Sequence, residues 1–170
     1  MTNKELCERY PFLIPFNRWS GMRITDAKNG GYYFANPDVV PDYDYEFTEL
    51  DDMPDGWRAA FGEQMCEEIR DALLKNGGED ALDKYRVTEI KEKYGSLRWY
   101  DSCGNDDVDK IIRKYERISE VTCIRCGEHA TKVSTGWISP FCDDCANEIS
   151  ENGILNIEFV PLLDDEEETT

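Results

Sequence analysis

The sequence predicts an α+β fold: a small mixed core with a hairpin and two main helices, followed by a C-terminal four-cysteine zinc ribbon. Three observations predict it. Apolar residues recur at helical spacing in two segments, β-prone residues flank a glycine between those segments, and two Cys-x-x-Cys pairs follow. At 170 residues the chain is long enough to bury a core and carry a small metal-binding subdomain.

The N-terminal segment predicts a short helix followed by an apolar plug. Thr2 and Glu5 match a capping box for a helix that reaches about Arg9. Tyr10-Pro11 ends this helix, because proline disfavours helical geometry in the residue before it. The apolar residues 12–16, together with Trp19, are expected to pack in the core.

Residues 43–50 alternate aromatic and acidic side chains, which predicts a half-buried strand with its acidic side outward. No basic residue occurs between positions 36 and 55. Two interpretations stay open: the carboxylates imitate a row of phosphates that a partner protein binds, or they form a solvated edge that discourages aggregation. The candidate partner contacts are Asp38, Asp42, Asp44, Glu46, Glu49, Asp51 and Asp52.

Two helices are expected to supply the core. The first begins near Asp52 as its cap, with Pro54 in the first turn, and runs to about Lys75 before Asn76-Gly77-Gly78 ends it. Residues 79–85 add one or two further turns. The core stripe of the first helix is Trp57, Phe61, Met65, Ile69 and Leu73. The second helix spans residues 107–118, with Val108, Ile111, Ile112, Tyr115 and Ile118 on one side.

Between these helices, residues 86–100 predict a hairpin that turns at Gly95. It holds the clearest basic cluster of the chain: Arg86, Lys91, Lys93 and Arg98. Basic residues interleaved with aromatics can bind nucleic acid. The negative net charge of the chain favours the other use, in which these residues pair with the acidic strand.

The paired cysteines predict a single structural zinc ion, Zn²⁺. Cys123 and Cys126 precede Cys142 and Cys145 at the spacing that lets two thiolate turns close around one tetrahedral ion. Gly127 supports this, because the turn needs a residue that tolerates positive φ. A redox dithiol or four unrelated core cysteines are the alternatives. The scattered Cys7, Cys66 and Cys103 are expected to be small buried hydrophobes.

These features divide the chain into an α+β body at residues 1–120 and a four-cysteine zinc ribbon at 121–151. A strand that returns to the body is expected at 152–163, and an acidic disordered tail at 164–170. Within the ribbon we expect a small hairpin formed by residues 130–133 and 136–138, then a short helix over residues 143–151.

Charge and motifs narrow the function classes. The chain carries 37 acidic against 19 basic residues, a net charge of -18, which disfavours nucleic-acid partners and favours basic ones. No eighteen-residue apolar run is present, so we expect a soluble protein without membrane contact. The single histidine, His129, lies inside the cysteine region, and no nucleophile elbow or phosphate-cradling loop is present. We therefore expect no catalytic residues.

The sequence resembles a family of small zinc-ribbon proteins encoded by bacteriophages and mobile elements. The matching stretches are residues 6–15, 45–68, 90–100, 122–127 and 136–145. The resemblance carries over the four paired cysteines as ligands and implies a phage origin and a bacterial host cytoplasm. Small acidic phage proteins often inhibit host defence, which raises that role by analogy.

The resulting expectation is a non-enzymatic, zinc-stabilised acidic phage protein. It would bind a host protein through that protein's basic surface, as an inhibitor of a host defence system. The alternative is a nucleic-acid-binding zinc ribbon that uses the basic hairpin over residues 86–98.

Overall fold

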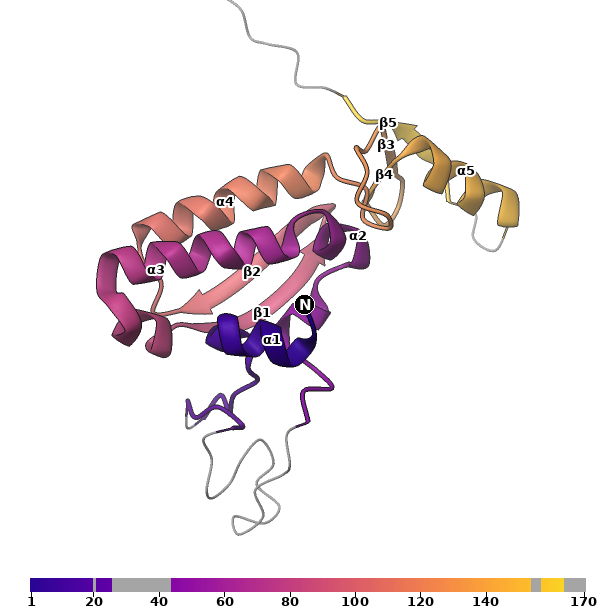
Figure 1. The fold of residues 1–170 in the computed structure, drawn as a ribbon. Coiled ribbons are helices and arrows are strands. Elements are labelled where there is room, and N and C mark those ends of the chain that lie inside the picture. Colours follow the sequence, from indigo (N-terminus) through magenta and orange to yellow (C-terminus); the bar gives the residue numbers. More distant parts are fainter. Residues whose placement is uncertain (20, 26–43, 154–156, 164–170) are drawn as a thin grey trace, which may run out of the picture.

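The structure is a computed structural model, and it describes residues 1–19, 21–25, 44–153 and 157–163. The described residues form a mixed fold of helices and two small antiparallel sheets. Figure 1 shows a larger body and a smaller region that extends from one end of it. We call the smaller region, residues 121–153 and 157–163, the cysteine module.

A two-stranded sheet and two helices form the body. The strands are β1 (Arg86–Lys93) and β2 (Ser96–Ser102), and the helices α3 (Glu63–Lys84) and α4 (Asp106–Glu120) lie side by side over them (Figure 1). The predicted hairpin and the second predicted helix are thus confirmed. Asn105 begins α4, because its side chain accepts hydrogen bonds from the first free N–H groups of the helix.

The turn of this hairpin has two residues, Tyr94 and Gly95, with φ of 55° and 81°. Positive φ at both positions is the pattern of a type I′ turn, whose twist matches that of paired strands. Lys93 and Ser96 face each other across the turn, and the register shifts by one bulge near Val87.

The N-terminal prediction is confirmed except at Trp19. Helix α1 (Asn3–Arg9) has the expected capping box, and the 3₁₀ helix η1 (Pro11–Leu13) follows it. Phe12 and Leu13 are fully buried, whereas the side chain of Trp19 is 88% exposed. Trp19 is therefore not part of the core.

The expected acidic strand over residues 43–50 is wrong for the part that the structure describes. The chain bends at Tyr45 and Glu46, with Tyr45 at a φ of 64°, and the 3₁₀ helix η2 (Glu49–Asp52) follows. Thr48 starts η2, since its N–H donates to Asp51 Oδ2 over 2.6 Å and its hydroxyl also donates to that oxygen. This local capping box turns the chain where the alternating pattern predicted an extended strand.

The first long helix also begins differently from the prediction. Asp52 is not its cap, because the helical run starts after Pro54 with α2 (Asp55–Trp57). It continues through one π-helical turn, η3 (Arg58–Gly62), into α3. Gly78 interrupts α3 with a φ of 66°, as the glycine pair predicts, and helical turns resume to Lys84.

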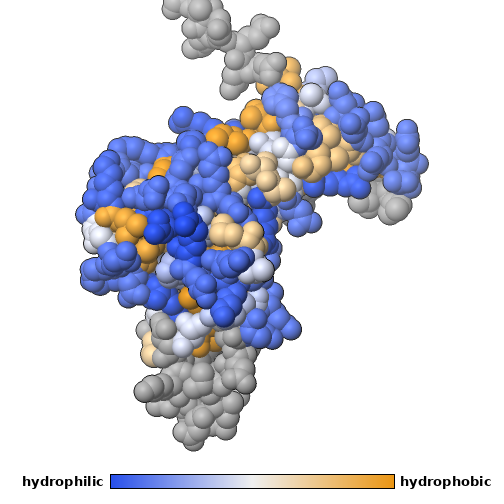
Figure 2. Space-filling model, in the orientation of Figure 1, coloured by the Kyte–Doolittle hydropathy of each residue, from blue (hydrophilic) through white to orange (hydrophobic). Residues whose placement is uncertain are grey.

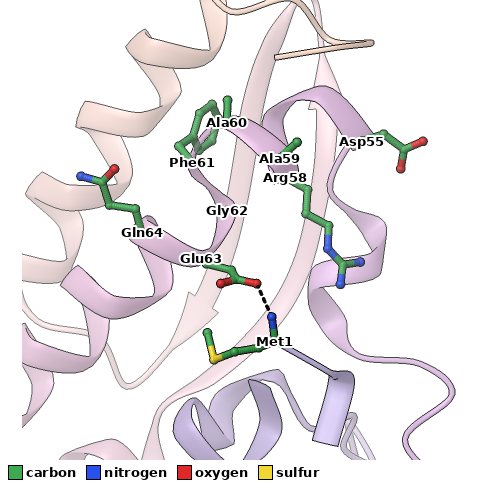
Figure 3. Close-up of a pocket in the computed structure, with 9 residues that line it drawn as sticks. All are labelled: Met1, Asp55, Arg58, Ala59, Ala60, Phe61, Gly62, Glu63 and Gln64. Carbon is green, nitrogen blue, oxygen red and sulfur yellow. Dashed lines mark hydrogen bonds and ion pairs between the residues drawn. The ribbon is translucent and has the colours of Figure 1, made fainter. Parts of the chain in front are cut away.

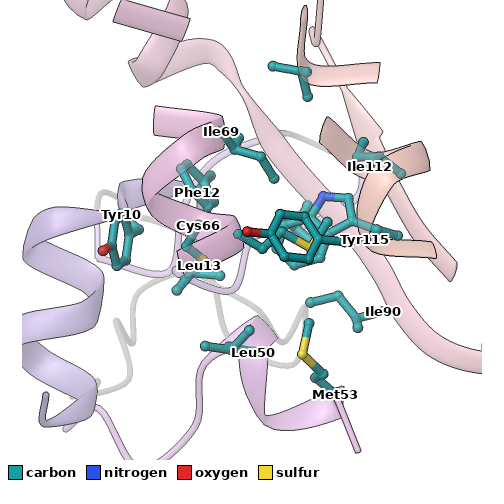
Figure 4. Packing of buried hydrophobic residues seen from close by; sticks show 14 of the residues in the cluster. Tyr10, Phe12, Leu13, Leu50, Met53, Cys66, Ile69, Ile90, Ile112 and Tyr115 are labelled. Carbon is teal, nitrogen blue, oxygen red and sulfur yellow. The ribbon is translucent and has the colours of Figure 1, made fainter. Parts of the chain in front are cut away.

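The core gathers side chains from every element of the body. Figure 4 shows α3 and α4 packing against residues of the N-terminal segment and of β1. The predicted stripes are confirmed: every member of the first is at most 5% exposed, and Val108, Ile112 and Tyr115 of the second are buried. Cys7 and Cys66 are also buried, but Cys103 is exposed, contrary to expectation.

In the cysteine module, a three-stranded sheet precedes and follows the helix α5 (Asp143–Asn152). Its strands are β3 (Lys132–Ser134), β4 (Pro140–Phe141) and β5 (Phe159–Pro161), in the order β4-β3-β5. The expected short hairpin is present, but its second strand is β4 and not residues 136–138.

A strand after α5 is also present. Its expected pairing with the body is wrong, because β5 pairs with β3 of the module. The acidic tail, 164–170, lies outside the described residues.

Candidate metal centre

The first cysteine pair lies in a tight turn directly after α4. The N–H of Cys123 donates to the carbonyl of Glu128 over 2.7 Å, and the N–H of Gly127 donates back to the carbonyl of Cys123 over 3.0 Å. Gly127 has a φ of 86°, the positive value that its place after Cys126 predicts. The turn therefore directs both sulfurs to one side.

The second pair lies at the start of α5. Cys142 is the N-cap of this helix, and its Sγ accepts a hydrogen bond from the N–H of Cys145 over 3.5 Å. Strand β4 leads into Cys142, and the carbonyl of Pro140 accepts a hydrogen bond from the N–H of Ile124 over 3.0 Å. This backbone contact joins the second pair to the turn that holds the first.

The four sulfurs converge, as the spacing predicts. Their Sγ atoms all lie within 4.8 Å of one another, and those of Cys126 and Cys142 are 3.6 Å apart. An ion bound tetrahedrally at about 2.3 Å places its sulfurs about 3.8 Å apart. The donor set and its spacing thus fit a metal ion coordinated by four thiolates.

The thiols lie in different environments. Burial alone would raise the pKa of Cys123, but backbone N–H groups of Cys142, Cys126 and Arg125 hold that pKa below its usual range, at about 7. Burial and the neighbouring cysteines raise the pKa of Cys145 instead. Cys123 is fully buried, whereas Cys126 is exposed. Four sulfurs this close cannot all ionise unless a cation offsets their charge.

The turn of the first pair packs directly on the body. The N–H of Gly56 donates to the carbonyl of Ile124 over 3.0 Å, and Trp57 Nε1 donates to the carbonyl of Thr122 over 2.9 Å. A Cβ built on Gly56 would lie 2.3 Å from the carbonyl oxygen of Cys123. The start of α2 and the turn of the first cysteine pair thus fit only because position 56 is glycine.

Sequence reasoning missed this contact. It treated Trp57 as core and gave Gly56 no role. The available signal was a glycine in the first turn of a helix, where it costs stability unless another backbone approaches closely.

The lining of a shallow cavity at the π-helical turn includes groups that form ion pairs. Figure 3 shows Glu63 next to the N-terminal amino group of Met1, 3.4 Å away. Arg58, which also lines the cavity, pairs with Asp51 over 2.5 Å. These pairs hold the N-terminal segment and η2 against the long helix.

Among the seven acidic residues predicted to contact a partner, those that the structure describes differ in burial and pairing. Asp38 and Asp42 lie outside the described residues. Glu49 is only 8% exposed, and burial raises its pKa to about 7. Asp51 is committed to Thr48 and Arg58. Exposed carboxylates remain at Asp44, Glu46 and Asp52.

Two of the four basic residues of the hairpin pair with acids of β1 and α4. Lys91 pairs with Glu89 on its own strand, and Arg98 lies 3.8 Å from Glu116 of α4. Figure 2 shows that the face formed by α3 and α4 is mostly hydrophilic, with a hydrophobic patch where the body meets the cysteine module.

Comparison with known proteins found no matching family model, curated protein or solved structure. Among the described residues, no helix is both long enough and apolar enough to cross a membrane. The geometry of the four cysteines is therefore the main guide to function.

Proposed function

We propose that this chain is a non-enzymatic binding protein stabilised by one Zn²⁺ ion. The observation that carries the proposal is the convergence of four cysteine sulfurs within 4.8 Å. Four thiolates fill a tetrahedral zinc ion and leave no position for water or substrate, so such an ion contributes folding free energy. Zinc and iron both suit a tetrahedral four-sulfur set, and we assign zinc.

The arrangement around the sulfurs supports a zinc ribbon as the architecture of the module. The antiparallel strands β3 and β4 lie between the two cysteine pairs, and one ligand comes from the start of α5. The ion would hold the two cysteine turns together. It would thereby also hold the carbonyls of Thr122 and Ile124 against the body.

The proposed partner is a host protein with a basic surface. A net charge of -18 attracts such a surface over distances up to the screening length, about 10 Å at 0.1 M salt. Asp44, Glu46 and Asp52 are the exposed remainder of the candidate patch. In keeping with the phage resemblance, we place this binding in the bacterial cytoplasm and assign it to the inhibition of a host defence system.

The test uses two triple variants and a bacterial lysate. Asp44→Asn, Glu46→Gln and Asp52→Asn together should reduce the captured partner at low salt. The matched control, Asp71→Asn, Glu79→Gln and Glu120→Gln, removes the same charge from exposed positions elsewhere. Equal loss in both variants would show that total charge matters and not this patch. Capture that does not weaken with added salt would overturn the proposal.

Nucleic-acid binding is the second candidate. Cross-strand pairing places Lys91 opposite Arg98, and the Lys91 ammonium lies 5.2 Å from the centre of the exposed Tyr100 ring. The candidate predicts a gel shift of single-stranded oligonucleotides at about 50 mM salt, where phosphate contacts are strong. The charge of the whole chain opposes it.

A further inference from the structure

A groove lies where the hairpin turn of the body meets the loop after β3. Its volume is about 280 Å³, and it is lined by Glu92, Lys93, Tyr94, Gly136, Trp137 and Ile138. The side chains of Tyr94 and Trp137 are 76% and 77% exposed. Large aromatic residues of this kind are enriched in the centres of protein interfaces.

Glu92 fixes both walls of the groove. One of its carboxylate oxygens accepts a hydrogen bond from the N–H of Gly95 over 2.6 Å. The other accepts a hydrogen bond from Trp137 Nε1 over 3.0 Å. Ile138 packs on the same turn, since a Cβ on Gly95 would lie 3.2 Å from Ile138 Cγ2. The aromatic walls are therefore positioned before any partner arrives, which lowers the entropy lost on binding.

Tyr94 occupies its position at a conformational cost. Its φ of 55° is in the left-handed region, where asparagine and glycine are favoured in a type I′ turn and bulky residues are uncommon. Burial does not offset this cost, because three quarters of the side chain is exposed. Residues with strained backbone conformations cluster at binding sites, where their side chains contact the ligand.

We propose that this groove takes an arginine side chain from an extended, basic segment of the partner protein. The inference rests on the proposed function and names one aromatic contact site for the basic partner. A guanidinium stacks on aromatic faces and is attracted to them electrostatically. The structure holds a cation against one wall, since Lys93 Nζ lies 5.7 Å from the centre of the Tyr94 ring.

Charge favours an arginine over other occupants. The chain has a net charge of -18, and the carboxylate of Glu92 lies behind the indole N–H of Trp137. A phosphate or an acidic peptide would meet that negative field. Lys93 is a positively charged residue in the lining of the groove. Reversing its charge therefore tests whether the occupant is positively or negatively charged.

The experiment compares two labelled peptides, one of alternating glycine and arginine and one of alternating glycine and lysine. Their charge is equal, so general electrostatic attraction acts on both. We expect the arginine peptide to bind about two- to fivefold more tightly, as a contact of about 0.5 to 1 kcal/mol gives. Trp137→Ala should abolish this preference. Trp19→Ala, which removes another highly exposed tryptophan, one that belongs to the body, should keep it.

Two further variants separate binding from folding. Tyr94→Asn should raise the melting temperature, because asparagine tolerates the turn, and yet reduce the arginine preference. Lys93→Glu should strengthen binding of the arginine peptide. Weaker binding by Lys93→Glu, or tighter binding of a single-stranded oligonucleotide than of either peptide, would overturn the assignment.

The outcomes distinguish the two proposals. If both peptides bind equally and Trp137→Ala changes nothing, the groove assignment fails while the acidic binding surface stands. If neither peptide binds at low salt, both proposals fail. A preference that Trp19→Ala abolishes would place the contact elsewhere and would also overturn the assignment.

Discussion

Gly56→Ala tests whether the turn of the first cysteine pair and the body form one cooperative unit. A Cβ at this position would lie 2.3 Å from the carbonyl oxygen of Cys123 and 2.6 Å from the carbonyl carbon of Ile124. Both are backbone atoms, so no side-chain rotation relieves the contact. The turn must move away from α2 by about 1 Å to restore ordinary van der Waals separation.

The expected cost follows from what that movement breaks. The hydrogen bond from the Gly56 N–H to the Ile124 carbonyl, now 3.0 Å, and that from Trp57 Nε1 to the Thr122 carbonyl, now 2.9 Å, would both be lost. Two hydrogen bonds at about 1 kcal/mol each, with about 1 to 3 kcal/mol for overpacking, give about 3 to 5 kcal/mol of lost unfolding free energy. This is a large part of the stability of a typical domain.

The assay is denaturant unfolding of the metal-loaded protein, with metal affinity measured in parallel. Gly62→Ala is the matched control. It lies six residues later, has ordinary helical φ, and its Cβ would meet Arg58 and Met53 at 3.4 Å. That variant should be neutral or more stable by up to about 1 kcal/mol. If Gly56→Ala is as stable as Gly62→Ala and binds metal as tightly, the coupling of turn and body is refuted.

Three other perturbations have defined outcomes. Glu49→Gln should stabilise the protein by about 1 to 2 kcal/mol at pH 8 and leave its stability unchanged at pH 4. Burial raises the pKa of Glu49 to about 7, so the ionised carboxylate destabilises the folded protein increasingly as the pH rises from the pKa of an unfolded glutamate to about 7. Equal effects at both pH values in denaturant titrations would contradict this. Cys126→Ser should release metal and lower the melting temperature markedly, and an unchanged melting curve with metal absent from both proteins would oppose the structural role. Asn105→Ala should cost about 1 kcal/mol through the lost cap of α4, measured by urea unfolding, whereas Asn105→Asp should cost much less.

Local patterns predicted most of the body. The capping box at Thr2, the break at Gly78 and the apolar faces of α3 and α4 follow from residues near each other in sequence. The four cysteines are predictable for the same reason, since the spacing within each pair sets the turn. Such features depend on local backbone geometry and on the regular spacing of apolar residues along a helix, which tertiary contacts rarely override.

The wrong predictions arise where local side-chain hydrogen bonds compete with an extended strand or where a contact joins distant parts of the chain. The alternation over residues 43–50 predicted a strand, but the side chains of Thr48 and Asp51 hydrogen bond locally and turn the chain. The sequence pattern predicts a strand at β5 but does not specify its neighbour, because strand pairing depends on residues elsewhere in the chain. The expected pairing with the body is therefore wrong, and β5 pairs with β3. The contact of Gly56 with the turn of the first cysteine pair joins segments more than 60 residues apart, and no local pattern encodes it.

X-ray absorption at the metal edge of the purified protein identifies the bound ion and its ligands. We expect one zinc ion per chain, with four sulfur neighbours at about 2.3 Å and no oxygen neighbour. An oxygen or nitrogen atom in the coordination shell, iron in place of zinc, or clearly less than one ion per chain would contradict this expectation.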